Sequence, residues 1–135
     1  MILLNHIIGI IAQNYIFCAF AQSKGDENLA KLDKDYEFPL YIFHQGKNYK
    51  AYEFFGCHRI KGDTFAFRVW APHAKSVSTV GDFNEWDASA NVMKKISDGI
   101  FEAKIENVKI YDCYKYAITT SKGDIIMKAD PYAFH

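Results

Sequence analysis

Residues 65–72 read Phe-Ala-Phe-Arg-Val-Trp-Ala-Pro, and their alternation is the strongest indication of the fold of the chain. Successive side chains of an extended chain point to opposite faces, so Phe65, Phe67 and Val69 share one face. This alternation predicts a β-strand that ends at Pro72. Trp70, followed by Ala-Pro, is assigned a packed structural position on the opposite face.

Further short strands are predicted downstream, each bounded by polar turn residues. They cover residues 77–80, 99–105, 112–120 and 125–128. Ser-Lys-Gly-Asp at 121–124 is typical of a hairpin turn between the last two. Short strands at this spacing predict an all-β fold, and specifically a β-sandwich.

The length of 135 residues allows one domain with a real hydrophobic core. Sixteen basic and sixteen acidic residues give a formal charge of zero, so no nucleic-acid or anionic-membrane partner is indicated. Cys18, Cys57 and Cys113 are far apart and odd in number, which favours free thiols over a zinc site or a disulfide framework. We therefore expect a cytoplasmic protein.

The N-terminal stretch, residues 1–22, is apolar but interrupted by polar residues at a period of four. This period favours an amphipathic helix that docks on a partner surface. No apolar run reaches the roughly 18 residues of a membrane span, so none is expected. Two alternatives stay open. Ala19-Phe20-Ala21 is typical of a signal-peptidase site, in which case residues 1–21 would be a signal peptide of a secreted protein, although no Lys or Arg precedes it. A wrongly chosen start codon is the other.

Composition divides the chain into three parts. Residues 1–35 are an N-terminal extension, made of the amphipathic segment and a polar linker. Residues 36–60 are rich in Tyr and Phe and are expected to pack, as irregular or short helical structure, against something larger; we call them the lead-in. Residues 61–135 are the predicted β-sandwich.

Motifs for catalysis, cofactors and metals are absent from the sequence. There is no glycine-rich phosphate loop, no His or Cys at metal-ligand spacing and no nucleophile elbow. Asp82, Glu85 and Asp87 lie on one short loop, where solvated carboxylates are expected to bond turn and strand-end groups rather than act as a glycosidase pair. We expect no catalytic residue, cofactor or metal.

Trp86, in the loop Gly-Asp-Phe-Asn-Glu-Trp-Asp at 81–87, has two interpretations. Its indole face could receive the apolar hydrogens of a sugar ring, with Asn84 and Lys115 bonding to hydroxyls if the loop folds beside the 112–120 strand. Alternatively, Trp86 caps one end of the core, as aromatic residues often do. The spacing does not separate the two.

Several motifs, in this order, resemble the family-48 carbohydrate-binding module, also called the isoamylase N-terminal domain. They are residues 67–74 (Phe-Arg-Val-Trp-Ala-Pro-His-Ala), 80–86 (Val-Gly-Asp-Phe-Asn-Glu-Trp), 114–116 (Tyr-Lys-Tyr) and 128–134 (Lys-Ala-Asp-Pro-Tyr-Ala-Phe). More narrowly, residues 43–46, 49–56 and the closing motif resemble the region ahead of the catalytic barrel in glycogen branching enzymes. The resemblance begins at residue 36.

The resemblance implies an immunoglobulin-like β-sandwich that binds or positions α-1,4-linked glucan, such as glycogen or maltooligosaccharide. In the related glycogen-binding domain of the AMP-activated kinase β subunit, a Trp and a Lys in matching motifs contact sugar. These positions are Trp86 and Lys115 here, and Asn84 is added as a hydroxyl partner. That domain has a second Trp platform where this chain has Asp124, Ile125 and Ile126, so weak binding is expected.

The resemblance also implies parts that this chain lacks. The family's last strand lies beyond Asp-Pro-Tyr, so we expect an open edge. The barrel of the parent 1,4-α-glucan branching enzyme is absent, so no catalysis is expected. The implied function is glucan binding and docking on that barrel in glycogen biosynthesis. The alternative is a structural module without useful sugar affinity, whose aromatic lead-in packs on the missing domain.

Overall fold

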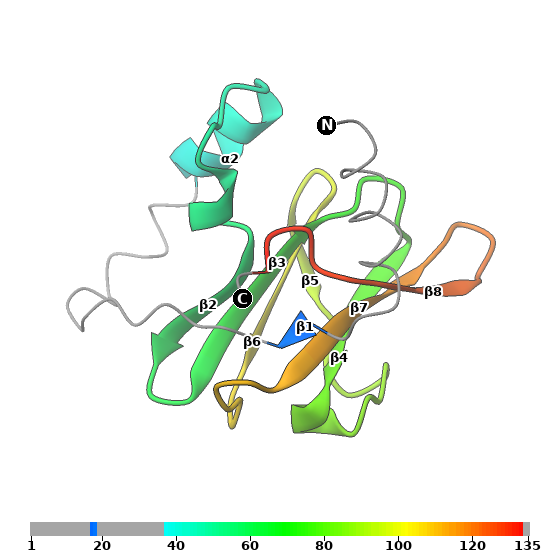
Figure 1. The fold of residues 1–135 in the computed structure, drawn as a ribbon. Helices are drawn as coiled ribbons and strands as arrows, with labels where there is room; N and C mark the ends of the chain where they lie inside the picture. The colour runs from blue at the N-terminus through cyan, green and yellow to red at the C-terminus, as the bar shows by residue number, and fades with distance from the viewer. Residues whose placement is uncertain (1–16, 19–36, 134–135) are drawn as a thin grey trace, which may run out of the picture.

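A computed structural model describes residues 17–18 and 37–133 of the protein. Its strands form two antiparallel sheets (Figure 1). The first, the β3 sheet, has the strand order β2 (Gly56–Lys61), β3 (Thr64–Trp70), β6 (Ile100–Ile105) and β5 (Lys94–Ser97). In the second, the β7 sheet, β7 (Cys113–Thr119) pairs along one edge with β4 (Ser76–Gly81) and along the other with β1 (Phe17–Cys18) and β8 (Ile125–Lys128).

The predicted all-β sandwich is confirmed, because one core cluster draws its side chains from both sheets. Phe65, Phe67 and Val69 of β3 share the inner face, as the alternation predicted. Tyr114 and Tyr116 of β7 lie opposite them. The ring of Tyr114 meets that of Phe67 edge-on, with centroids 5.0 Å apart, which suits the charge distribution of aromatic rings.

Besides the two-residue β1 (Phe17–Cys18), two strands were not predicted. β5 is short and begins with two exposed lysines, so its sequence lacks an apolar alternation. β2 pairs with β3 from Gly56 onward, so residues 56–60, assigned to the lead-in from composition, belong to the sandwich. The aromatic residues just before Gly56 obscured its start.

The lead-in packs against one end of the β3 sheet, near Ile96 and Ile100, and its helix lies at the upper left of Figure 1. It contains α2 (Glu37–His44) and the short 3-10 helix η2 (Ala51–Glu53), in agreement with the predicted short helical packing. Its side chains and those of the sheet form a second apolar cluster, centred on Phe55. The buried members are Ala51, Phe54, Phe55 and Ile100.

Arg68 is the one charged residue in the segment 65–72, and it is buried. It lies on the outer face of the β3 sheet, where its Nε donates to Glu102 Oε2 at 2.7 Å and its Nη1 donates to the Phe54 carbonyl at 3.2 Å. Its guanidinium also lies 4.7 Å from the centroid of the Phe54 ring. The buried charge is thus paired, and it joins the sheet to the lead-in.

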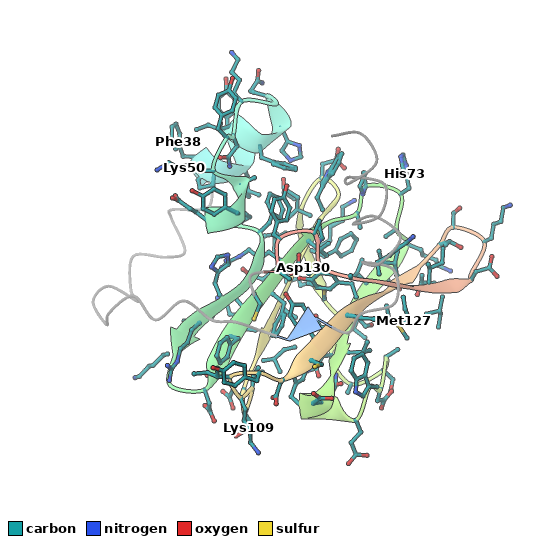
Figure 2. All side chains as sticks on the ribbon, viewed as in Figure 1. Phe38, Lys50, His73, Lys109, Met127 and Asp130 are labelled. Atoms are coloured by element: carbon teal, nitrogen blue, oxygen red, sulfur yellow. The ribbon has the colours of Figure 1, made fainter. Side chains whose placement is uncertain are left out.

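Asp130 lies two residues after the end of β8 and is buried, and Figure 2 places it near the centre of the molecule. Its Oδ2 accepts hydrogen bonds from the hydroxyls of Tyr114 (2.5 Å) and Tyr116 (3.0 Å), and its Oδ1 accepts one from the Tyr132 N–H. Burial raises the pKa of Asp130. The Tyr132 ring in turn stacks on Phe55, 5.5 Å away, so the segment after β8 contacts both the main core and the lead-in cluster.

Other sequence predictions had mixed outcomes. The amphipathic segment lies outside the described residues except for Phe17 and Cys18, and there the helix prediction is wrong, because both belong to β1 and pair with Tyr114 and Cys113. Trp70 is 50% exposed rather than packed, and its ring meets the Phe43 ring of the lead-in edge-on, with centroids 5.5 Å apart. In the described part of the chain, no helix is both long and apolar enough to span a membrane.

Candidate functional site

The loop after β4 begins beside the start of β7, where Gly81 pairs with Tyr114. A Cβ at Gly81 would lie 2.5 Å from the Cys113 carbonyl oxygen and 2.7 Å from the Phe83 ring, so only glycine fits. The loop then forms the short 3-10 helix η3 (Asp82–Asn84). Phe83 turns inward and packs on the main core, 5.5 Å from the Phe67 ring. The glycine and the phenylalanine of the motif are therefore structural.

Asn84 is bonded within the protein. Its Oδ1 accepts from the Gly81 N–H at 2.9 Å, and its Nδ2 donates to the Thr79 carbonyl (2.8 Å) and to Asn91 Oδ1 (2.7 Å). A side-chain amide has two donors, and both are used here, which leaves one acceptor lone pair for any ligand. Asn84 thus shapes the loop, and its predicted bond to a sugar hydroxyl is restricted to that lone pair.

Trp86 is held in place by backbone and side-chain bonds. Its N–H donates to the Gly81 carbonyl at 3.0 Å, and its indole Nε1–H donates to Asp82 Oδ1, also at 3.0 Å. Asp82 Oδ2 accepts from the Cys113 N–H at the start of β7, 2.8 Å away. Asp82 therefore fixes the indole ring relative to β7. The sequence contained a signal for this tether, an Asp four residues before the Trp, but its role was not predicted.

The backbone at Trp86 adopts a conformation that bulky residues rarely take. Glu85 has φ 54° and Trp86 has φ 63°, both in the left-handed region. Such conformations persist only where surrounding bonds determine them, and they cluster at binding and catalytic sites. Of the two interpretations of Trp86, the structure favours a surface role, since Phe83 takes the core position and the Trp86 side chain is partly exposed.

Lys115 lies on the outer face of the β7 sheet. It follows Tyr114 and precedes Tyr116, which both point into the core. Its partner in β4 is Val80, the residue before Gly81, to which the Trp86 backbone is bonded. The structure therefore brings the Lys115 position beside the loop of Trp86, as the sequence hypothesis required. Within the described residues, we find no hydrogen bond or ion pair that engages the Lys115 ammonium.

Two of the three acidic residues of the loop, Asp82 and Asp87, bond turn and strand-end groups as predicted. Asp82 bonds Trp86 and Cys113, as above. Asp87 accepts from the hydroxyl and the backbone N–H of Ser89, and these two bonds lower the pKa of Asp87. Among residues 17–18 and 37–133 there is no group of three His, Cys, Asp or Glu side chains that could hold a metal ion.

Comparisons with known proteins agree with the motifs. The family model for carbohydrate-binding module 48 (isoamylase N-terminal domain) matches residues 54–133. The 1,4-alpha-glucan branching enzyme of Fusobacterium nucleatum is 48% identical over 97 residues, covering 70% of this chain and 16% of that enzyme. The corresponding enzyme of Halothermothrix orenii is 47% identical over 109 residues, covering 78% of this chain and 17% of that enzyme. The chain thus spans about one sixth of the length of these curated relatives.

Among solved structures, the apo pullulanase of Paenibacillus barengoltzii aligns with a TM-score of 0.49 at 20% identity, covering 68% of this chain and 16% of that one.

Proposed function

The chain belongs to the carbohydrate-binding module 48 family, the isoamylase N-terminal domain, and we propose that it is a non-catalytic module that binds α-1,4-linked glucan. Glycogen and maltooligosaccharides are the expected ligands. The observation that supports this proposal most strongly is the tethered, partly exposed Trp86 ring, on a loop that begins one residue after the strand partner of Lys115. A ring fixed in advance loses little conformational entropy when a ligand stacks on it.

The chemistry of binding follows from the two side chains. The face of an indole ring carries partial negative charge and attracts the weakly positive C–H groups on one side of a glucose unit. The Lys115 ammonium has three N–H donors and would bond the hydroxyls at the rim of the same unit. Asn84 contributes by holding the loop, through its bonds to Gly81, Thr79 and Asn91. One Trp platform implies weak affinity.

The relatives add a second element to the proposal. Because they are 1,4-alpha-glucan branching enzymes and this chain matches about one sixth of their length, we propose that the module serves such an enzyme and docks on its catalytic domain. The exposed aromatic side chains of the lead-in are the proposed docking surface: Phe38, Tyr41, Tyr49 and Tyr52. These same exposed rings favour the second candidate function, a packing module with no useful sugar affinity.

Titration with maltoheptaose tests the two candidates. The protein has two tryptophans, and Trp70 is half-exposed. Tryptophan fluorescence is therefore best followed in a Trp70→Phe background, in which Trp86 is the only tryptophan. We expect a saturable change in emission with maltoheptaose and none with the β-1,4-linked cellohexaose. Calorimetric titration of Trp86→Ala, in the otherwise native chain, should show about tenfold or greater loss of affinity, equivalent to roughly 1.4 kcal/mol.

The packing-module candidate makes the opposite prediction. In that case neither maltoheptaose nor glycogen changes the Trp86 emission, and Trp86→Ala behaves as the unmodified protein does. Either result contradicts glucan binding through this loop. Thermal unfolding of each variant, measured alongside, distinguishes lost affinity from a lost fold.

A further inference from the structure

Left-handed backbone conformations gather at one end of the sandwich. Apart from glycines, the residues with positive φ in the described chain are Glu85, Trp86, Asn107 (φ 61°) and Tyr111 (φ 77°). The first two belong to the loop after β4 and the other two to the loop between β6 and β7. In Figure 1 β4 and β6 both run to the lower edge, where these loops lie, on the side away from α2.

Asp82 joins the two loops. One carboxylate oxygen accepts from the Trp86 ring and the other from the Cys113 N–H. Tyr111 lies two residues before Cys113, whose thiol also donates to the Tyr111 carbonyl at 4.0 Å. Lys115 lies two residues after Cys113. Cys113, the first residue of β7, is therefore linked to the Trp86 ring through Asp82. Tyr111 and Lys115 lie two residues before and two residues after it.

The β6–β7 loop is held as firmly as the loop of Trp86. Val108 is buried in the main core, and its N–H donates to the Asp63 carbonyl at 3.1 Å. The next turn is closed from both sides, since the Lys109 N–H donates to Asp112 Oδ2 and the Asp112 N–H donates to the Lys109 carbonyl. Figure 2 shows Lys109 at the lower edge of the molecule.

Tyr111 nevertheless points out of the packed structure, with 69% of its surface exposed. A tyrosine with φ 77° is strained, because its Cβ crowds the backbone in that region. Ordered loops keep such strain where the exposed group has a use. This strained, exposed ring lies two residues before Cys113, whose N–H bonds the same Asp82 carboxylate that holds the Trp86 ring. It is therefore suited to contact a ligand that already occupies Trp86.

We propose that Tyr111 is a second aromatic contact for the glucan, so that the binding surface extends from Trp86 past the start of β7 to Tyr111. This inference rests on the proposed function. It supplies a second ring from the β6–β7 loop, at the opposite end of β7 from the β7–β8 hairpin. A glucan long enough to reach both rings gains affinity from Tyr111, and a short one bound at Trp86 does not.

The test compares maltotriose and maltoheptaose by calorimetric titration. Tyr111→Ala should weaken maltoheptaose binding about fivefold to tenfold and leave maltotriose binding unchanged, because only the longer chain reaches both rings. Tyr111→Asn removes the ring while tolerating the left-handed backbone, so it should give the same loss without backbone strain. Tyr111→Phe keeps the ring and should retain the affinity. Ile110→Ala, at the exposed apolar residue just before Tyr111, is the matched control and should bind as the unmodified protein does.

The outcomes separate this inference from the proposed function. If Trp86→Ala loses affinity while both ring-removing variants at Tyr111 bind maltoheptaose normally, the role of Tyr111 is wrong and glucan binding stands. Equal losses for maltotriose and maltoheptaose also contradict the extended surface. If Trp86→Ala itself binds normally, the proposed function fails, and the role of Tyr111 fails with it.

Discussion

The molecule has two aromatic regions, built on opposite sheets by different means. In the loop after β4, Trp86 donates hydrogen bonds to Gly81 and Asp82, and Asn84 accepts one from Gly81. These bonds hold the partly exposed Trp86 ring in a strained conformation. In the lead-in, packing holds many rings. Phe55 is fully buried. Tyr49 is 93% exposed, and within the described residues we find no hydrogen bond that holds its side chain.

The difference shows why the number of aromatic residues is a poor guide to a binding site. Packing energy depends on buried area and has no preferred direction, so it fixes rings by burying them. Hydrogen bonds are directional and can hold a ring that stays at the surface. The lead-in has more rings, but the loop has the one ring whose orientation is determined before a ligand arrives.

The largest expected effect comes from breaking the packed region. Phe55→Ala removes a ring that contacts Phe43, Phe54 and Tyr132, so it should lower the free energy of unfolding by roughly 3–5 kcal/mol, measured by urea denaturation. The fraction that remains folded should bind maltoheptaose with unchanged affinity. A matching loss of affinity would show that the two regions are coupled.

A smaller effect on stability is expected from Asn84→Ala. Three hydrogen bonds are lost, and with them about 2–3 kcal/mol of unfolding free energy at this partly buried site. Affinity for glucan should fall as well, because the backbone around Trp86 loses its support. If affinity falls while stability is unchanged, Asn84 contacts the sugar directly instead of shaping the loop.

The smallest effect is a pH dependence confined to the packed region. Burial lowers the pKa of His58 below its ordinary value of 6.5, against the opposing effect of its hydrogen bond to the Phe55 carbonyl, 2.8 Å away. The folded state therefore favours neutral His58, and stability should fall as pH decreases through the unfolded pKa. Buried Asp130 has a raised pKa and contributes a slope of opposite sign above its unfolded value.

Denaturation curves between about pH 7.5 and 5.5 measure this dependence, with His58→Gln as the control. The unmodified protein should lose more stability than the variant over that range. Equal slopes for the two proteins would exclude His58 as the source. Glucan affinity, which we propose to depend on Trp86 and Lys115, should not follow this titration.

Strands with regular alternation could be predicted because a period of two is a local property of the chain. β8 was predicted at residues 125–128, where it lies, and β4 within one residue at each end. β2 and β5 could not be predicted in this way, because neither has an apolar alternation of its own. β2 is held by pairing with β3, and β5 by pairing with β6.

Within the site, the sequence motif identified the loop, and the roles of its members needed the structure. The requirement for glycine at residue 81 depends on the Cys113 carbonyl, a residue 32 positions away in the chain. The use of both Asn84 donors depends on Thr79 and Asn91. None of these contacts follows from a local pattern.

By itself, the sequence determined the sandwich class, the family and the candidate ring at Trp86, because alternation and motif order are written along the chain. Only the tertiary structure decided which rings face solvent and which are held there. In the tertiary structure, Asp82 orients the indole ring and Trp70 is half-exposed. Tyr111 lies at the same end of β7 as the loop of Trp86. Exposure and hydrogen-bond geometry depend on residues that are distant in the sequence. These residues come into contact only when the two sheets pack together around one core.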